Sequence, residues 1–148
     1  MQLNTTRFGT IEVNESEFIN FPWGIPGFEE FKSYILLQYK NGPFQWLQST
    51  EEPSVAFVVC PPGFIEVEYK VPVSKTTMIK LEKPEDLVIL LIVSFDQDNP
   101  DKKKAMRVHV RSPLLFNVAA RIGYQWTMEP DELKRQVVTP AIRSPEKG

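Results

Sequence analysis

The chain contains one cysteine and one histidine among 148 residues, and its longest apolar run, Leu87 to Val93, is short. Cys60 has no partner for an internal disulfide, and one Cys with one His cannot build a structural zinc site. The run is far below the ~20 residues that a helix needs to cross a bilayer. The N-terminal residues show no basic stretch followed by an apolar one, as a secretory signal would. We therefore expect a cytoplasmic protein without membrane association.

Sequence motifs for chemistry are also missing. No Gly-rich phosphate loop and no G-x-S-x-G element occurs. The acids Asp96, Asp98 and Asp101 lack the spacing and glycine of a calcium loop. His109 lies between valines without a serine or cysteine in a recognisable nucleophile setting. We therefore expect no enzyme, no catalytic residue, no metal and no cofactor; His109 as a general base is a third and weakest hypothesis.

Charge is balanced overall but uneven along the chain. The net charge is −2, yet residues 1–101 carry fifteen acids and seven bases, and residues 102–148 carry four acids and ten bases. This asymmetry fits either separate faces for partners of opposite sign or ordinary surface solvation. The acidic majority argues against direct nucleic-acid binding, which needs clustered Lys and Arg. The short run Lys102-Lys103-Lys104 is typical of a solvated loop.

Strand patterns dominate. Thirteen prolines disfavour long helices, and short alternating or continuous apolar segments recur between turn residues. The pattern predicts an all-β fold, a small twisted antiparallel β-barrel with at most one or two short helical turns. We expect a single β-barrel domain over residues 1–128 and a polar C-terminal extension over 129–148, with a short helix near Asp131 to Gln136 and a mobile tail after it. The segment from Phe64 to Val73 is predicted as an edge strand, and Ser74 to Leu81 as a short helical turn.

Two aromatic segments are candidates for binding. In FPWGIPGFEEF, residues 21–31, two glycines permit reversals of the chain and two prolines stiffen it. We expect Phe21 and Phe28 to fold onto the barrel end and Trp23 to be exposed. In PFQWLQS, residues 43–49, alternation predicts Phe44 and Trp46 inside and Leu47 outside. Nearby glutamates supply an acidic rim. The candidate partner-binding residues are Trp23, Ile25, Glu29, Glu30, Leu47, Glu51 and Glu52.

The order of these segments resembles that of the flagellar assembly factor family, FliW. The match is collinear from about Thr6 to Met128, and its most specific parts are the FPWGIPGFE and PFQWLQS segments. The resemblance implies a small β-barrel without catalysis that binds two proteins: flagellin, and CsrA, the dimeric repressor of flagellin translation. It further implies that free FliW captures CsrA and lifts repression, and that accumulating flagellin releases CsrA again. We expect a monomer.

A second hypothesis comes from a different class of function. A β-barrel with aromatic side chains on a curved sheet is also the anatomy of a single-stranded nucleic-acid-binding protein. The net acidity of residues 1–101 argues against it, and a direct RNA-binding measurement separates the two.

Overall fold

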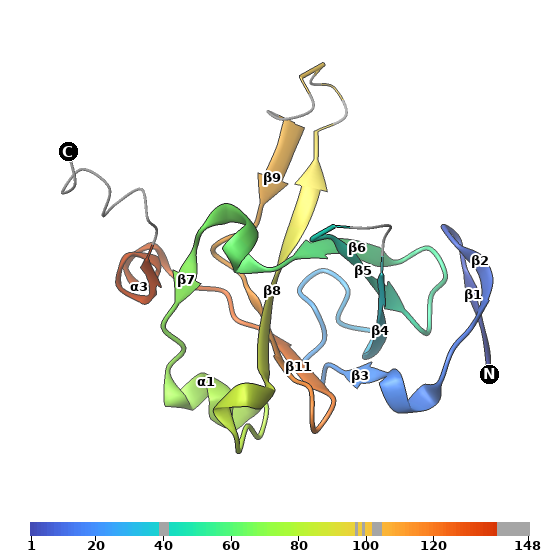
Figure 1. The fold of residues 1–148 in the computed structure, drawn as a ribbon, viewed down its shortest axis with the longest axis horizontal. Coiled ribbons are helices and arrows are strands. Elements are labelled where there is room, and N and C mark those ends of the chain that lie inside the picture. Colours follow the sequence, from blue (N-terminus) through green and yellow to red (C-terminus); the bar gives the residue numbers. More distant parts are fainter. Residues whose placement is uncertain (39–41, 97, 99, 102–104, 139–148) are drawn as a thin grey trace.

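Seven strands of an eight-stranded sheet close into a small barrel, and the eighth strand stands at the open end of the strand order (Figure 1). The computed structural model describes residues 1–38, 42–96, 98, 100–101 and 105–138. The strand order is β10-β11-β3-β4-β5-β6-β8-β9, and an additional β8–β10 pairing completes the ring. The strands are β3 (Ile19–Asn20), β4 (Ser33–Gln38), β5 (Gln45–Ser49), β6 (Ala56–Cys60), β8 (Leu87–Phe95), β9 (Met106–Val108), β10 (Leu114–Asn117) and β11 (Ile122–Gln125).

Antiparallel pairing prevails around the ring. The β4–β5 hairpin has the predicted pairing, with Leu36 opposite Leu47 and Leu37 opposite Trp46; its turn at Asn41 and its strand end at Lys40 lie outside the described residues. The β11–β3 pairing is parallel and rests on Ile122 opposite Asn20. The all-β barrel prediction is confirmed.

Aromatic rings fill the barrel interior. Phe21 is fully buried and contacts Tyr34 and Phe116 edge to face, at centroid distances of 5.2 and 5.7 Å. Leu47 and Val59 belong to the same buried cluster. Edge-to-face pairs of this kind add about 0.5–1.5 kcal/mol to the burial of apolar area. The interior is therefore a packed core.

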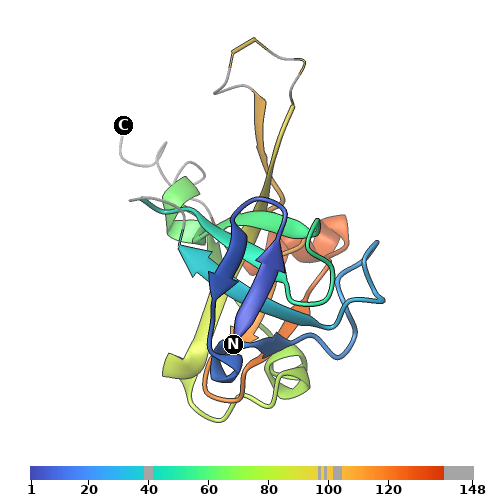
Figure 2. The ribbon, with the colours of Figure 1, turned by 90° about the vertical axis from the view of Figure 1, so that its right-hand side faces the viewer.

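The prediction for the inside of β5 is wrong. Leu47 is 0% exposed inside the barrel, whereas Trp46 lies on the outer face. That outer face is covered by a separate hairpin of β1 (Gln2–Thr5) and β2 (Gly9–Glu12), seen beside β4 in Figure 1 and in front in Figure 2. Phe8 meets the Trp46 ring at 5.8 Å, and the Arg7 guanidinium lies 4.7 Å above it.

A second layer covers the opposite outer surface. It contains β7 (Glu68–Tyr69), α1 (Val73–Met78), α3 (Pro130–Gln136) and β12 (Val137–Val138). The helices at α1 and α3 are as predicted, but the strand expected from Phe64 to Val73 is largely wrong. Pro62 begins a 3₁₀ turn, η2 (Pro62–Ile65), and the left-handed backbone at Glu66 (φ 57°) ends it, which leaves a strand of two residues.

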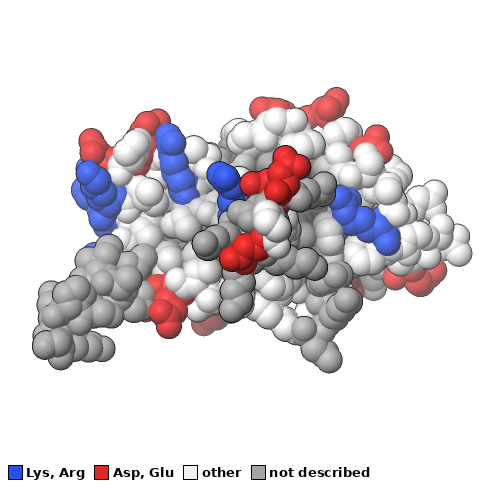
Figure 3. Space-filling model, turned by 90° about the horizontal axis from the view of Figure 1, so that it is seen from above, with Lys and Arg blue, Asp and Glu red and all other residues white. Residues whose placement is uncertain are grey.

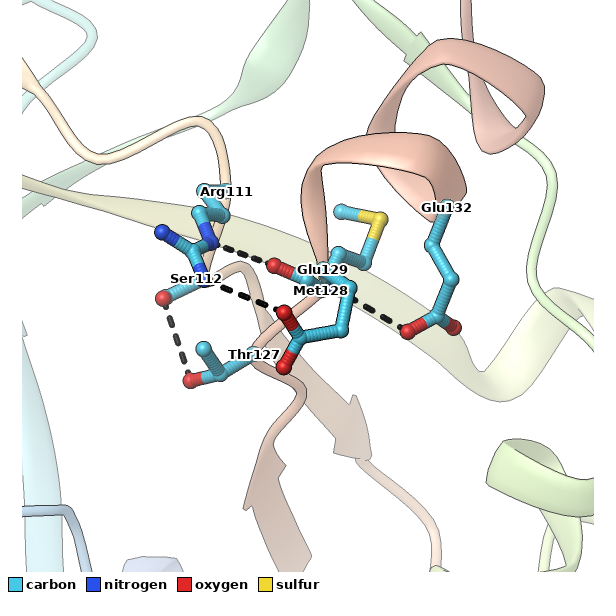
Figure 4. Close-up of polar contacts among 6 residues, drawn as sticks. All are labelled: Arg111, Ser112, Thr127, Met128, Glu129 and Glu132. Atoms are coloured by element: carbon cyan, nitrogen blue, oxygen red, sulfur yellow. Dashed lines mark hydrogen bonds and ion pairs between the residues drawn. The ribbon is translucent and has the colours of Figure 1, made fainter.

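The beginning of the C-terminal extension packs on this layer. β12 pairs with β7 through Val137 opposite Tyr69, and Leu133 of α3 packs against the apolar cluster around Trp126. The Arg111 guanidinium donates to the Met128 carbonyl and lies 3.8 Å from the Glu129 carboxylate (Figure 4). Residues 129–138 are thus packed against the barrel, and the tail beyond them lies outside the described residues.

Candidate functional site

The Phe21–Phe31 loop turns sharply at two glycines. Gly24 and Gly27 have φ values of +70° and +88°, in the left-handed region that favours glycine. The N–H of Gly24 donates to the Phe21 carbonyl at 2.8 Å, and the Phe28 N–H donates to the Ile25 carbonyl at 2.7 Å. These turns send Phe21 inward and leave two other rings of the loop at the surface.

Trp23 lies on one side of the loop and is 49% exposed, as predicted. Its ring meets the edge of Tyr124 on β11 at 5.5 Å, and the Lys75 ammonium of α1 lies 5.8 Å from the same tyrosine ring. Ile25 is 2% exposed and belongs to the barrel core. It faces inward because the turn at Gly24 reverses the chain, so the surface role expected for Ile25 is wrong.

Phe28 lies on the other side of the loop. Its ring packs edge-on against Phe57 of β6 at 5.1 Å, yet 36% of the residue is exposed. The expectation that Phe28 folds onto the barrel is thus met in part. The Phe28–Phe57 pair brings the Phe21–Phe31 loop next to the β5–β6 hairpin.

Four glutamates belong to the Phe21–Phe31 loop and the β5–β6 turn, and three of them accept backbone N–H groups. Glu51 accepts the N–H groups of Lys32 and Ser33 at 2.6 and 2.8 Å. Glu29 accepts the Gly27 N–H at 3.0 Å, and Glu52 accepts the Ser54 N–H at 3.3 Å. These bonds hold the loop and the β5–β6 turn in place. Glu30 is exposed.

Burial and negative charge both affect the pKa of Tyr34, which lies in the barrel core. The side chain is fully buried, and its hydroxyl has no hydrogen-bond partner among the described residues. Burial first, and the Glu51 carboxylate second, raise the pKa of Tyr34 to about 12. The glutamate that fixes the loop therefore also acts on the core.

The partly exposed Phe28 ring, the half-buried Phe57 ring behind it and these carboxylates form what we call the acidic aromatic surface: Phe28, Phe57, Glu29, Glu30, Glu51 and Glu52. Trp23 lies apart, on Tyr124. Sequence reasoning missed Phe57 and Tyr124, because each becomes a surface partner only when the loop folds over its strand. No local signal in SVAFVVC or RIGYQ distinguishes those rings from core residues.

Charged side chains elsewhere are mixed in sign. Seen from above, acidic and basic side chains are interspersed with uncharged surface (Figure 3). Among the described residues of this face, neither sign of charge therefore forms a continuous region.

Cys60 and His109, the two side chains considered for reactivity, do not belong to the acidic aromatic surface. Cys60 is buried, and burial raises the pKa of its thiol. The Ser94 hydroxyl lies 3.0 Å from the His109 ring, a neighbour that sequence reasoning missed because it is fixed by the β8–β9 register. Both residues are exposed on a projecting hairpin instead of lining an enclosed pocket. Within the described residues, no group of three metal-ligating side chains converges, and no helix is long and apolar enough to cross a membrane.

The fold is a small closed β-barrel whose Phe21–Phe31 loop presents the partly exposed Phe28 ring beside carboxylates, a combination compatible with contact to another protein. The family model for FliW protein matches residues 2–138. The flagellar assembly factor FliW of Alkaliphilus metalliredigens is 36% identical over 135 residues, covering 88% of this chain and 81% of its own. That of Syntrophus aciditrophicus is 39% identical over 132 residues, covering 87% and 81%. The chain therefore belongs to the FliW family of flagellar assembly factors.

A solved structure agrees. The crystal structure of a flagellar assembly factor FliW superimposes with a TM-score of 0.77 at 26% identity, covering 88% of this chain and 90% of that one.

Proposed function

We propose that this protein is a cytoplasmic, non-enzymatic regulator that binds flagellin and the translational repressor CsrA. In its free form it captures CsrA and relieves repression of flagellin translation. When flagellin accumulates, flagellin occupies the protein, and CsrA is released. The output depends on the relative affinities and concentrations of two protein partners.

The acidic aromatic surface carries this proposal. A repressor that binds RNA is expected to present basic side chains, and Glu30 with its neighbouring carboxylates offers the complementary charge. Complementary charge raises the association rate and selectivity more than the final affinity. The exposed part of the Phe28 ring, backed by Phe57, supplies apolar area at the centre, where interface energy concentrates.

The test is size-exclusion chromatography of the purified chain with CsrA, repeated after addition of flagellin. Co-elution with CsrA that flagellin abolishes supports the exchange. Binding to flagellin without CsrA reduces the proposal to a flagellin chaperone. Direct binding to the flagellin transcript would favour the nucleic-acid alternative.

Two variants test the surface itself. Phe28→Ala removes the central ring, and Glu30→Lys reverses one rim charge. Each has a control elsewhere: Phe64→Ala removes a ring that is 44% exposed on η2, and Glu85→Lys reverses a charge on the η3 turn (Pro84–Asp86). We expect Phe28→Ala to weaken CsrA binding at least tenfold, about 1.4 kcal/mol or more, and both controls to bind normally. Equal losses in the controls would remove the surface from the proposal.

A further inference from the structure

The β8–β9 hairpin extends beyond the barrel and ends the sheet at an open edge. Figures 1 and 2 both show it projecting away from the other strands. In the strand order β9 stands last, with β8 as its neighbour. No strand in the described part of the chain pairs with its outer side. An unprotected edge of this kind is a template for another strand.

The backbone of β9 has groups available on that outer side. The His109 N–H donates to the Ile92 carbonyl, and the Ala105 carbonyl accepts the Asp96 N–H, so residues 105, 107 and 109 turn their backbone groups toward β8. Met106 and Val108 therefore direct theirs outward. The Val108 carbonyl accepts the Val110 N–H at 3.0 Å. Both backbone groups of Met106 and the N–H of Val108 remain directed to the open edge.

Side chains divide the hairpin into two faces of different chemistry. On one face Met106 is opposite Phe95, which is 52% exposed, and Val108 is opposite Val93. On the other face Arg107 is opposite Ser94, and His109 follows it two residues later. Both Arg107 and His109 are exposed. Asp96 shares their face, but its carboxylate accepts the Asp98 N–H at 3.1 Å within its own turn.

We propose that the outer edge of β9 docks an extended segment of a partner protein in which apolar residues alternate with an acidic residue. Its backbone would pair with Met106 and Val108, as in strand addition to a sheet edge. Its apolar side chains would extend the row formed by Phe95 and Met106. Its acidic side chain would lie opposite Arg107, where opposite charges on neighbouring strands stabilise pairing.

A second copy of this chain fits the edge poorly. In the antiparallel register that pairs the whole of β9 with itself, the two Arg107 side chains face each other, and like charges directly opposite destabilise a sheet. Nucleic acid also fits poorly, because the open groups are those of a strand edge and a half-exposed apolar row lies beside them. An acidic, strand-forming peptide satisfies both the backbone and the side chains.

The test is an NMR titration of the ¹⁵N-labelled full chain with the peptide acetyl-TVTVEVTVT-amide, and in parallel with TVTVKVTVT, in which lysine replaces glutamate. We expect the glutamate peptide to shift the amide signals of Met106 and Val108 and to bind up to about fivefold more tightly than the lysine peptide. Arg107→Glu should reverse this preference. Lys134→Glu, the same charge change on exposed α3, should leave it intact.

Several results would overturn the proposal. They are the absence of shifts at β9, an unchanged preference in Arg107→Glu, or an equal loss in Lys134→Glu. Met106→Pro removes an edge donor and should weaken both peptides alike; normal binding by this variant would exclude strand addition. Oligouridine that shifts the same signals, or concentration-dependent self-association at β9 seen by sedimentation, would assign the edge to RNA or to a second copy.

Discussion

Phe21 occupies the space in which a side chain at Gly123 would lie. A Cβ added to Gly123 would be 2.5 Å from the Cζ of Phe21, with two more ring carbons within 2.8 Å. The loop that carries Trp23 and Phe28 is thereby fixed to β11 through its first residue. The backbone of one strand and the ring of another segment form a single packed unit.

Gly123→Ala is accordingly expected to destabilise the protein by about 1–3 kcal/mol through overpacking. Phe21→Leu introduces a smaller and more flexible side chain. As a single variant it should be destabilised because it leaves a cavity. The double variant should be more stable than the sum of the two losses predicts, which urea unfolding of all four proteins measures. Strict additivity would mean that the methyl group is accommodated by other movement.

Alanine substitutions at Gly24 and Gly27 form a second pair of variants whose stabilities can be compared. Both have positive φ, which costs a residue with a side chain about 1–2 kcal/mol. A Cβ at Gly24 would also lie 2.6 Å from the Glu29 Cα, whereas nothing lies within 4 Å of a Cβ at Gly27. Gly24→Ala should therefore lower the free energy of unfolding distinctly more than Gly27→Ala. Equal losses, compared by denaturant midpoint, would show that the loop backbone yields at Gly24.

Much of the fold could be predicted from sequence, because strand and turn patterns are local. The β4–β5 hairpin and the long strand β8 follow from alternation, continuous apolar runs and turn residues. The inside of β5 could not be predicted, because Trp46 owes its cover to Phe8 and Arg7, about forty residues earlier in the chain. The same limit applies to the candidate surface: exposed Trp23 follows from its position between Pro22 and Gly24, but Ile25 turns inward and Phe57 joins the surface only in the folded barrel.

Substitutions at Glu51 and Glu30 should have different effects on stability and on CsrA binding. Glu51 accepts two backbone N–H groups near the surface, so Glu51→Ala replaces two hydrogen bonds to a charged group by hydrogen bonds to water and should cost about 1–3 kcal/mol. Glu30 is exposed, so Glu30→Ala should change stability by no more than about 0.5 kcal/mol and weaken CsrA binding. Thermal unfolding and a binding titration of both variants provide the comparison. A large stability loss in Glu30→Ala would assign it a structural role.

Tyr34 predicts how stability changes at alkaline pH. Its pKa is raised from 10.0 to about 12 in the folded protein, so the folded state keeps a proton that the unfolded state has lost. This contribution is fully present below pH 10 and is lost as pH rises to about 12, by about 2–3 kcal/mol. Tyr34→Phe should reduce that loss, as measured by urea unfolding at pH 8 and at alkaline pH.

Tyr69→Phe is the contrasting variant. The Tyr69 hydroxyl donates to the Val110 carbonyl at 2.6 Å, so its removal should cost about 0.5–1.5 kcal/mol already at neutral pH. Tyr34→Phe removes a hydroxyl without a partner among the described residues and should be neutral or slightly stabilising there. If Tyr34→Phe proved as costly at neutral pH, its hydroxyl would have a partner in solution.

The last prediction concerns salt, because salt screens the attraction between exposed charges but has little effect on apolar contacts. If the carboxylates of the acidic aromatic surface attract CsrA, raising ionic strength from about 0.05 to 0.5 M shortens the Debye length from roughly 14 to 4 Å and should slow association. Stopped-flow association rates should fall steeply in the native protein and less steeply in Glu30→Gln. Dissociation rates should rise mainly in Phe28→Ala, because the ring contributes after the encounter. Association rates that are independent of salt would remove electrostatic attraction from the proposed exchange.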